Sequence, residues 1–313
     1  MAIRTVIAAA AAPAALAAVL LTTSAASAAP PPIMAAAAVT APAWPALTSA
    51  NWAGYYTLPQ PGHPMLGASV TFTVPKVDCR YSRGAAPYYG GMWAGVGGLG
   101  SAGPRVEPGG RAWLEQAGVR VDCASKSAQA VYQPFWEVVP TVKTKDPDYA
   151  GSQVFRDAHG RETYVRPGDR VTVIVVAPAA NGSNSRAWGF QVLVRDQNGR
   201  FAARWHHDKV LPRGVYTGRT AEVITEWPAG YAYGSWVLGS SGLVNTGAVQ
   251  YDHADYTSTV KGDPKQEAFP VPGAPVILTH NGRVAIYPSA PYQAADSAMP
   301  DAFTTRYGPN WWK

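Results

Sequence analysis

The feature that most constrains the fold of this chain is a series of short β-forming runs, with no segment of helical periodicity between them. Each run is rich in Val, Ile, Thr, Tyr, Phe or Trp, and the 31 glycines and 28 prolines supply turn signals along the whole chain. The runs are residues 51–57, 68–75, 88–98, 112–121, 130–139, 170–178, 187–196, 201–207, 220–227, 247–257, 274–280 and 301–307. A dozen strands at this spacing predict an all-β fold, an antiparallel β-sandwich with two large packed sheets.

Turn chemistry supports this prediction at two places. Asp196-Gln197-Asn198-Gly199 predicts a hairpin, because Asn-Gly supplies the positive φ values of a two-residue turn. Arg166-Pro167-Gly168-Asp169 predicts a second turn. The stretch at residues 289–299 is compatible with a helix, but it is short.

The first 28 residues have the features of a secretory signal peptide. Arg4 precedes an apolar run, and Ala26-Ser27-Ala28 fits the small-residue cleavage rule. A transmembrane anchor is the alternative, but Pro13 interrupts the run and no basic flank follows it. We therefore expect a secreted, extracellular protein with no membrane association after cleavage. Residues 29–48 are rich in Ala and Pro and predict a linker or a short propeptide, so residues 49–313 form the expected domain.

The charge and the cysteine content of the chain bear on its expected partners and on the compartment in which it folds. The net charge of +6 is scattered along the chain and includes no Lys/Arg run, so no nucleic-acid partner is expected. The two cysteines, Cys79 and Cys123, predict one disulfide in an oxidising compartment, with a free nucleophilic cysteine as the alternative. Nothing in the sequence requires more than a monomer.

The sequence motifs of other enzyme classes are either absent from this chain or lie in a context that does not fit them. The GxGxxG match at residues 95–100 is followed by SAGPRVEPGG, which cannot begin the helix of a dinucleotide site. His206 and His207 are adjacent on an expected strand and face opposite sides, so they cannot bind one metal ion together. GxSxG, HExxH and the Asp-Thr/Ser-Gly motif are absent from the sequence. We expect no metal and no cofactor.

Two acids stand out in the run TAEVITEW at residues 220–227. Glu222 and Glu226 would share one face of a strand, about 13 Å apart. A glycosidase would need two carboxylates about 5–9.5 Å apart, so this pair does not fit one. If either acid is catalytic, its partner must come from another strand.

Polar groups also occur inside the apolar runs MWAGVGG, LEQAGV and YQPFWEVVP. With SANWAGYY, VTFTVPKV, RPGDRV and TAEVITEWP, these pieces resemble, in the same order, the glutamic endopeptidases (eqolisins), secreted acid proteases of fungi and some bacteria. The resemblance runs from about Ser49 to the C-terminus and implies a bacterial secreted member with a concanavalin-like (lectin-like) sandwich. It also implies a catalytic pair, which falls on Gln116 and Glu226, with Glu222 as a supporting or structural acid.

The residue types suit peptide hydrolysis. A carboxylate such as Glu226 can take a proton from the attacking water and return it to the leaving amine. The amide of Gln116 can donate a hydrogen bond to the tetrahedral intermediate. The resemblance implies a polypeptide substrate, with Trp93, Glu137 and, as a weaker candidate, Phe135 lining the substrate site.

Structural roles remain open for the same residues. Without the resemblance, Glu226 would read as a satisfied buried acid and Gln116 as a solvent-facing strand residue. The aromatic residues could be sandwich core, and Glu115 is expected to be exposed on the opposite face. The alternative function is a non-catalytic lectin-like sandwich that binds glycan or peptide in the same aromatic cleft. The chain has Gly97 where the family commonly has an acid.

Overall fold

A computed structural model describes residues 46–58, 65–98, 113–139, 151–177, 187–211, 220–228, 230–232, 235–237, 241–260, 263–270, 273–295, 297 and 300–308. The chain divides into two units, Met1–Val39 and Thr40–Lys313, and every described residue belongs to the second. The expected signal peptide and all but the last three residues of the expected linker lie outside the described residues.

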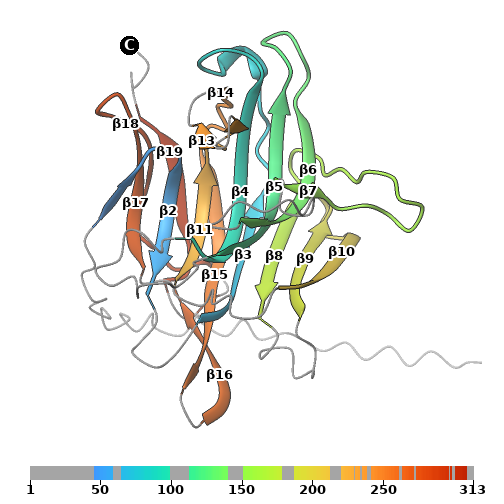
Figure 1. Ribbon diagram of the computed structural model, residues 1–313, viewed down its shortest axis with the longest axis vertical. Coiled ribbons are helices and arrows are strands. Elements are labelled where there is room, and N and C mark those ends of the chain that lie inside the picture. The colour runs from blue at the N-terminus through green and yellow to red at the C-terminus, as the bar shows by residue number, and fades with distance from the viewer. Residues whose placement is uncertain are drawn as a thin grey trace, which may run out of the picture. The chain divides into compact units, whose positions relative to one another are not determined.

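The described residues form an antiparallel β-sandwich, which confirms the predicted fold class (Figure 1). The first layer runs in the order β7 (Gln153–Val154), β6 (Val131–Val139), β5 (Leu114–Cys123), β4 (Tyr88–Gly97), β11 (Ala221–Glu226), β2 (Trp52–Thr57) and β17 (Ala274–His280). The second runs β10 (Phe201–Val210), β9 (Ala187–Arg195), β8 (Arg170–Val176), β3 (Met65–Thr73), β15 (Val249–Val260), β19 (Phe303–Tyr307) and β18 (Arg283–Pro288). The layers join where β17 pairs with β18.

All twelve predicted runs form strands, and the other elements were not predicted from the sequence. They are β1 (Leu47–Ser49), β12 (Gly230–Ala232), β13 (Ser235–Val237), β14 (Gly242–Leu243), β16 (Asp263–Pro270) and the 3-10 turn η1 (Cys79–Tyr81), besides β7 and β18 above. β1 pairs in parallel with β17, so the sandwich already includes Leu47. The described part of the chain has no α-helix, including the described residues of 289–299. It also has no helix long and apolar enough to cross a membrane.

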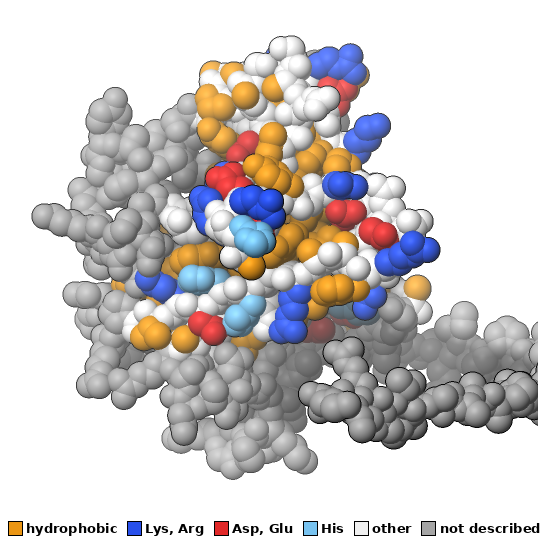
Figure 2. All heavy atoms as spheres, turned by 90° about the vertical axis from the view of Figure 1, so that its right-hand side faces the viewer, with side chains coloured by type: hydrophobic (Ala, Val, Ile, Leu, Met, Phe, Trp, Pro, Cys, Tyr) orange, Lys and Arg blue, Asp and Glu red, His pale blue; other side chains and the backbone are white. Residues whose placement is uncertain are grey.

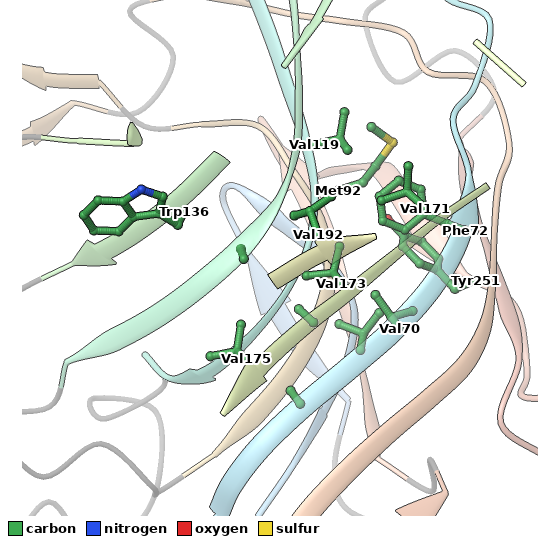
Figure 3. Close-up of a cluster of buried hydrophobic side chains, with 14 of the residues drawn as sticks. Val70, Phe72, Met92, Val119, Trp136, Val171, Val173, Val175, Val192 and Tyr251 are labelled. Carbon is green, nitrogen blue, oxygen red and sulfur yellow. The ribbon is translucent and has the colours of Figure 1, made fainter. Parts of the chain in front are cut away.

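The main core fills the space between the two layers. Alternate residues of β3 and β8 point into it, among them Val70, Phe72, Val171 and Val173, all completely buried (Figure 3). From the other layer, β4, β5 and β11 contribute their alternate residues, such as Val119. Because strand side chains alternate, the remaining residues of those strands lie on the outer face of the first layer.

The cysteine prediction is confirmed, and one turn prediction is refined. Cys79 and Cys123 form a disulfide, with their Cα atoms 5.8 Å apart. Between β9 and β10, Gly199 has a φ of 76°, and the Asp196 and Arg200 backbones close the loop. Asn198 does not have a positive φ, so the loop is longer than the predicted two-residue turn. Arg166–Asp169 forms the expected turn.

Candidate active site

The outer face of the first layer carries the predicted site residues. In antiparallel pairs, residues directly opposite one another project to the same side of the sheet. Glu226 pairs with Gly91, and Gln116 pairs with both Gly95 and Glu137. The residues that this pairing places on one face are Trp93, Gln116, Phe135, Glu137, Glu222 and Glu226.

Three N–H groups hold the carboxylate of Glu226. Its Oε1 accepts hydrogen bonds from Asn51 Nδ2 at 3.2 Å and from Trp52 Nε1 at 3.1 Å, and its Oε2 accepts one from Trp93 Nε1 at 2.7 Å. Burial raises the pKa of Glu226, while these three donors partly oppose the rise because they favour the charged form. On the other side the neighbour is Gly91, which has no side chain to cover the carboxylate.

Gln116 and Glu137 form a second polar pair on neighbouring strands. Gln116 Nε2 donates to Glu137 Oε2 at 2.8 Å, and Gln116 Oε1 is buried with no hydrogen-bond partner among the described residues. Burial, followed by the negative charge of Glu226, raises the pKa of Glu137 to about 7. The Gln116 amide and the Arg120 guanidinium act in the opposite direction.

Glu226 and the pair formed by Gln116 and Glu137 lie in different rows of the same face, because Glu226 pairs with Gly91 and Gln116 pairs with Gly95. Glu137 holds Gln116 directly and responds to the charge of Glu226, although the two acids lie on strands separated by β4 and β5. Gln116, Glu137 and Glu226 therefore lie on one face of the sheet, where Gln116 and Glu137 share a hydrogen bond and the charge of Glu226 raises the pKa of Glu137.

The predicted aromatic residues project from this same outer face and are buried there. Trp93 is completely buried, Phe135 is 3% exposed, and Trp93 packs edge-on against Trp52 with ring centroids 5.1 Å apart. Gly118 lies between Trp93 and Phe135 in the strand pairing, and a Cβ atom there would lie 2.6 Å from Trp93 Cβ. Because Gly118 has no side chain, it leaves room for the Trp93 indole, whose N–H donates to Glu226.

Asn51 and Trp52 are functional candidates that the sequence reasoning did not assign to the site. Both belong to the run SANWAGYY, and Trp52 pairs directly with Glu226 in the β2–β11 ladder. The signal was a polar Asn-Trp pair at the start of a strand that borders the acidic run.

Glu222 belongs to the same face but to a different environment. It is completely buried, and burial raises its pKa well above the ordinary value, with only the Thr220 side chain opposing the rise. Gly95 separates it from Gln116 in the strand pairing. Trp93 Cζ3 and Leu114 Cδ1 each lie 3.0 Å from where a Gly95 Cβ would be, so apolar atoms occupy the space above this glycine.

The expectation that Glu115 is exposed is wrong. Its side chain does face away from Gln116, but that side of β5 is the core between the layers, and Glu115 is completely buried. The strand alternation was therefore correct, whereas the assumption that one face of β5 is solvated was not.

The histidines of β10 face opposite sides, as the strand pattern predicted. His206 Nε2 lies 2.9 Å from Asp208 Oδ1, whereas the His207 ring stacks on Trp136 with centroids 3.9 Å apart. Within the described ranges, no three His, Cys, Asp or Glu side chains are grouped as metal ligands. Figure 2 views the molecule from the right-hand side of Figure 1. On this face, basic and acidic side chains are interspersed with apolar ones.

Comparison with known proteins supports the fold. No family model and no curated protein sequence matches the chain. A scytalido-glutamic peptidase, solved with a peptide-based transition-state analogue, superposes with a TM-score of 0.50 at 15% identity, covering 83% of this chain and 99% of that one. Aspergilloglutamic peptidase from Aspergillus niger gives a TM-score of 0.43 at 19% identity, covering 71% and 99%. The chain thus has an eqolisin-like fold, as the sequence resemblance implied.

Proposed function

We propose that the protein is a secreted, acid-acting endopeptidase of the glutamic type, a monomer that uses Glu226 and Gln116 and needs no cofactor. The observation that carries this proposal is that the Glu226 carboxylate, held by three N–H donors, and the hydrogen-bonded pair Gln116–Glu137 lie on one face of an eqolisin-like sandwich. The alternative, a non-catalytic lectin-like sandwich, would use the same face for binding alone.

In the proposed mechanism, Glu226 is the general base. Asn51, Trp52 and Trp93 fix its orientation through N–H donors, so the ionised carboxylate can take a proton from a water molecule that attacks the scissile carbonyl. The same carboxyl group then transfers that proton to the departing amine. No covalent intermediate forms on the protein.

Gln116 acts on the oxyanion. When its amide N–H turns to the developing negative charge, it stabilises the tetrahedral intermediate, and such a donor contributes a factor of about 10²–10³ in rate. The buried Gln116 Oε1 is then available to accept a hydrogen bond from the attacking water.

Glu137 accounts for action at acid pH. Below its pKa of about 7, Glu137 is neutral and competes weakly for the Gln116 amide. Above that pH the ionised Glu137 holds the amide more strongly and adds a negative charge beside the developing oxyanion. Activity should therefore fall as the pH rises through about 7.

The test is cleavage of denatured casein or haemoglobin between pH 2 and 7 by the parent, Glu226→Gln and Gln116→Ala. We expect fragments from the parent, none above background from Glu226→Gln, and a kcat lower by about 10²–10³ for Gln116→Ala. Gln250→Ala, an exposed glutamine on β15, is the matched control and should retain parental activity.

The outcomes separate the two functions. Fragments whose rate is unchanged by Glu226→Gln would contradict the proposed mechanism. If the folded parent cleaves no protein at any pH but retains peptide or glycan on a column, the binding sandwich is the better assignment.

A further inference from the structure

Arg120 lies on the same face of the sheet as Glu226, with one strand between them. It lies on β5 opposite Gly91 of β4, and Gly91 lies opposite Glu226 of β11. The three residues form one row across the sheet, in which only a glycine separates the arginine from the proposed base. Two inter-strand spacings put the Cα atoms of Arg120 and Glu226 about 10 Å apart.

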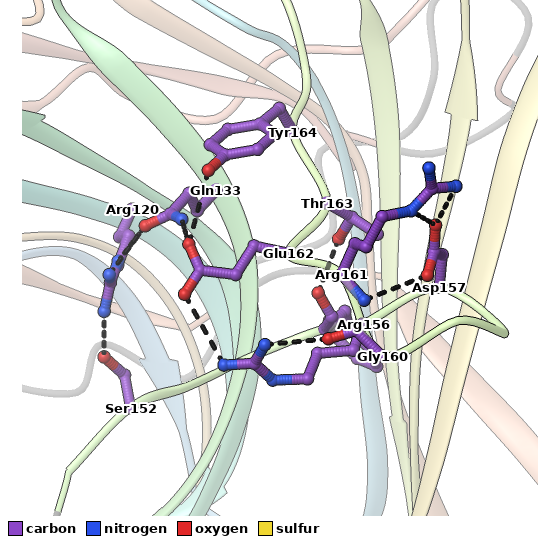
Figure 4. Close-up of polar contacts among 11 residues, drawn as sticks. Arg120, Gln133, Ser152, Arg156, Asp157, Gly160, Arg161, Glu162, Thr163 and Tyr164 are labelled. Atoms are coloured by element: carbon purple, nitrogen blue, oxygen red, sulfur yellow. Dashed lines mark hydrogen bonds and ion pairs between the residues drawn. The ribbon is translucent and has the colours of Figure 1, made fainter.

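A ladder of polar contacts holds Arg120 from the β6 side (Figure 4). Gln133, only 5% exposed, accepts from Arg120 Nε at 3.1 Å and from Nη2 at 2.6 Å through Oε1. Gln133 Nε2 donates to Glu162 Oε2 at 2.7 Å, and because a carboxylate only accepts, this contact fixes the Gln133 carbonyl oxygen toward Arg120. Ser152 Oγ accepts from Arg120 Nη1 at 3.2 Å.

These contacts leave part of the guanidinium available. A guanidinium has five N–H donors in a planar fork, and the described contacts engage Nε–H and one N–H on each terminal nitrogen. Asp122 Oδ2 also lies 3.4 Å from Nε, the nitrogen that Gln133 already engages. With its side chain 30% exposed, Arg120 can present a second N–H from each terminal nitrogen to a carboxylate, the ligand that this fork fits best.

The positive charge of Arg120 also acts on the proposed site, because it lowers the pKa of Glu137 against the effects of burial and of Glu226. Its hydrogen-bond partners Gln133 and Ser152 are uncharged, and the carboxylate of Asp122 lies 3.4 Å from its Nε. Arg120 is therefore a preorganised cation on the face of the proposed site, to one side of Glu226. The residues that form its described hydrogen bonds include no second cation.

We propose that Arg120 is a specificity-determining residue that binds a carboxylate of the substrate, an Asp or Glu side chain within about three residues of the scissile bond. The span follows from the 10 Å row and the rise of about 3.3 Å per residue in an extended peptide. This inference rests on the proposed peptidase function and adds to it a substrate class, peptides with an acidic residue near the cleavage point.

The experiment compares internally quenched peptides that differ only by Glu or Gln at single positions flanking the cleaved bond. The parent should cleave the best Glu peptide at least tenfold faster in kcat/KM than its Gln counterpart, at a pH where the substrate glutamate is ionised. Arg120→Gln should reduce this ratio to below about threefold, and Arg120→Glu should favour a Lys peptide. Arg161→Gln, which removes an exposed arginine paired with Asp157, is the control and should keep the parental ratio.

A structural role for Arg120 would lower the rates for both peptides together, so the ratio distinguishes the two roles. An unchanged ratio in Arg120→Gln, or no preference in the parent, overturns the inference. If the parent cleaves nothing, the readout is binding affinity. The same peptides are then bound to Glu226→Gln and to the double variant Glu226→Gln with Arg120→Gln. Selectivity for Glu that depends on Arg120 would then support the subsite while the peptidase proposal fails, and equal affinities would overturn the subsite.

Discussion

Trp93 donates its indole N–H to Glu226 Oε2 at 2.7 Å from a completely buried position on the same face of the sheet. An indole nitrogen only donates, so this contact favours the ionised form of the acid. Trp52 and Asn51 act on the other oxygen. Glu226 is thereby held in one orientation and kept from the larger pKa rise that its burial alone would cause.

Removing the Trp93 donor should shift the acid limb of the pH–activity profile. In Trp93→Phe the pKa of Glu226 rises further, so the proposed general base is ionised only at higher pH. The limb of kcat/KM that rises with pH should therefore move to higher pH, measured on a quenched peptide. Trp188→Phe, a buried tryptophan on β9, is the control for the loss of an indole. An acid limb that stays in place would show that Trp93 does not tune Glu226.

Glu222 should make the folded protein more stable at acid than at neutral pH. Burial raises its folded-state pKa well above the ordinary 4.5, so the folded protein keeps a proton that the unfolded chain releases. The free energy of unfolding should then fall as the pH rises from about 4.5 toward the folded-state pKa. Glu137 and Glu226, whose pKa values are also raised, act in the same direction.

Urea unfolding at pH 4.5 and pH 7.5 measures this effect. Glu222→Gln should show a smaller loss of stability between the two pH values than the parent does. Glu162→Gln, at an exposed acid that is ion-paired with Arg156, should behave as the parent. An identical pH dependence in Glu222→Gln would mean that Glu222 is not the group responsible.

The strands could be predicted only in part from the sequence, and β18 shows why. Asn281 and Gly282 have φ values of 50° and 74°, as a two-residue hairpin turn between β17 and β18 requires. The Asn-Gly signal is present at that position, but the strand it leads into was not recognised. At Asn198-Gly199 the same dipeptide forms a longer loop, so the signal marks a hairpin without fixing its loop length.

The contacts of the site could not be predicted from local pattern. Which N–H groups reach Glu226 depends on β11 lying between β2 and β4, a pairing of residues more than 120 positions apart in sequence. Alternation placed Glu222 and Glu226 on one face, yet it could not show that one is completely buried and the other is held by three donors. The burial of Glu115 likewise depends on the second layer, which covers its face.

The disulfide should contribute substantially to stability. Cys123 ends β5, the strand that carries Gln116 and Arg120, and the bond to Cys79 closes a separation of 44 residues. The entropy model for a loop of this length gives about 4 kcal/mol. Replacing both cysteines with serine should lower the free energy of unfolding in urea by about this amount, and reduction of the parent should reproduce the loss. A change below about 1 kcal/mol would contradict a structural role for the bond.

Gly97 should tolerate neither an acid nor alanine, although the family resemblance implies an acid at this position. Its φ is 94°, and its N–H donates to Thr220 O while its C=O accepts from Thr220 Oγ1. A residue with a Cβ atom is strained at this φ, at a cost of about 1–3 kcal/mol. Gly97→Ala and Gly97→Asp should both unfold at lower urea concentration, whereas Gly247→Asp, at an exposed glycine with open space and a φ of 69°, should lose less. If Gly97→Asp is as stable as the parent while Gly97→Ala is not, the carboxylate must gain a partner. The site would then retain a place for the acid that this chain lacks.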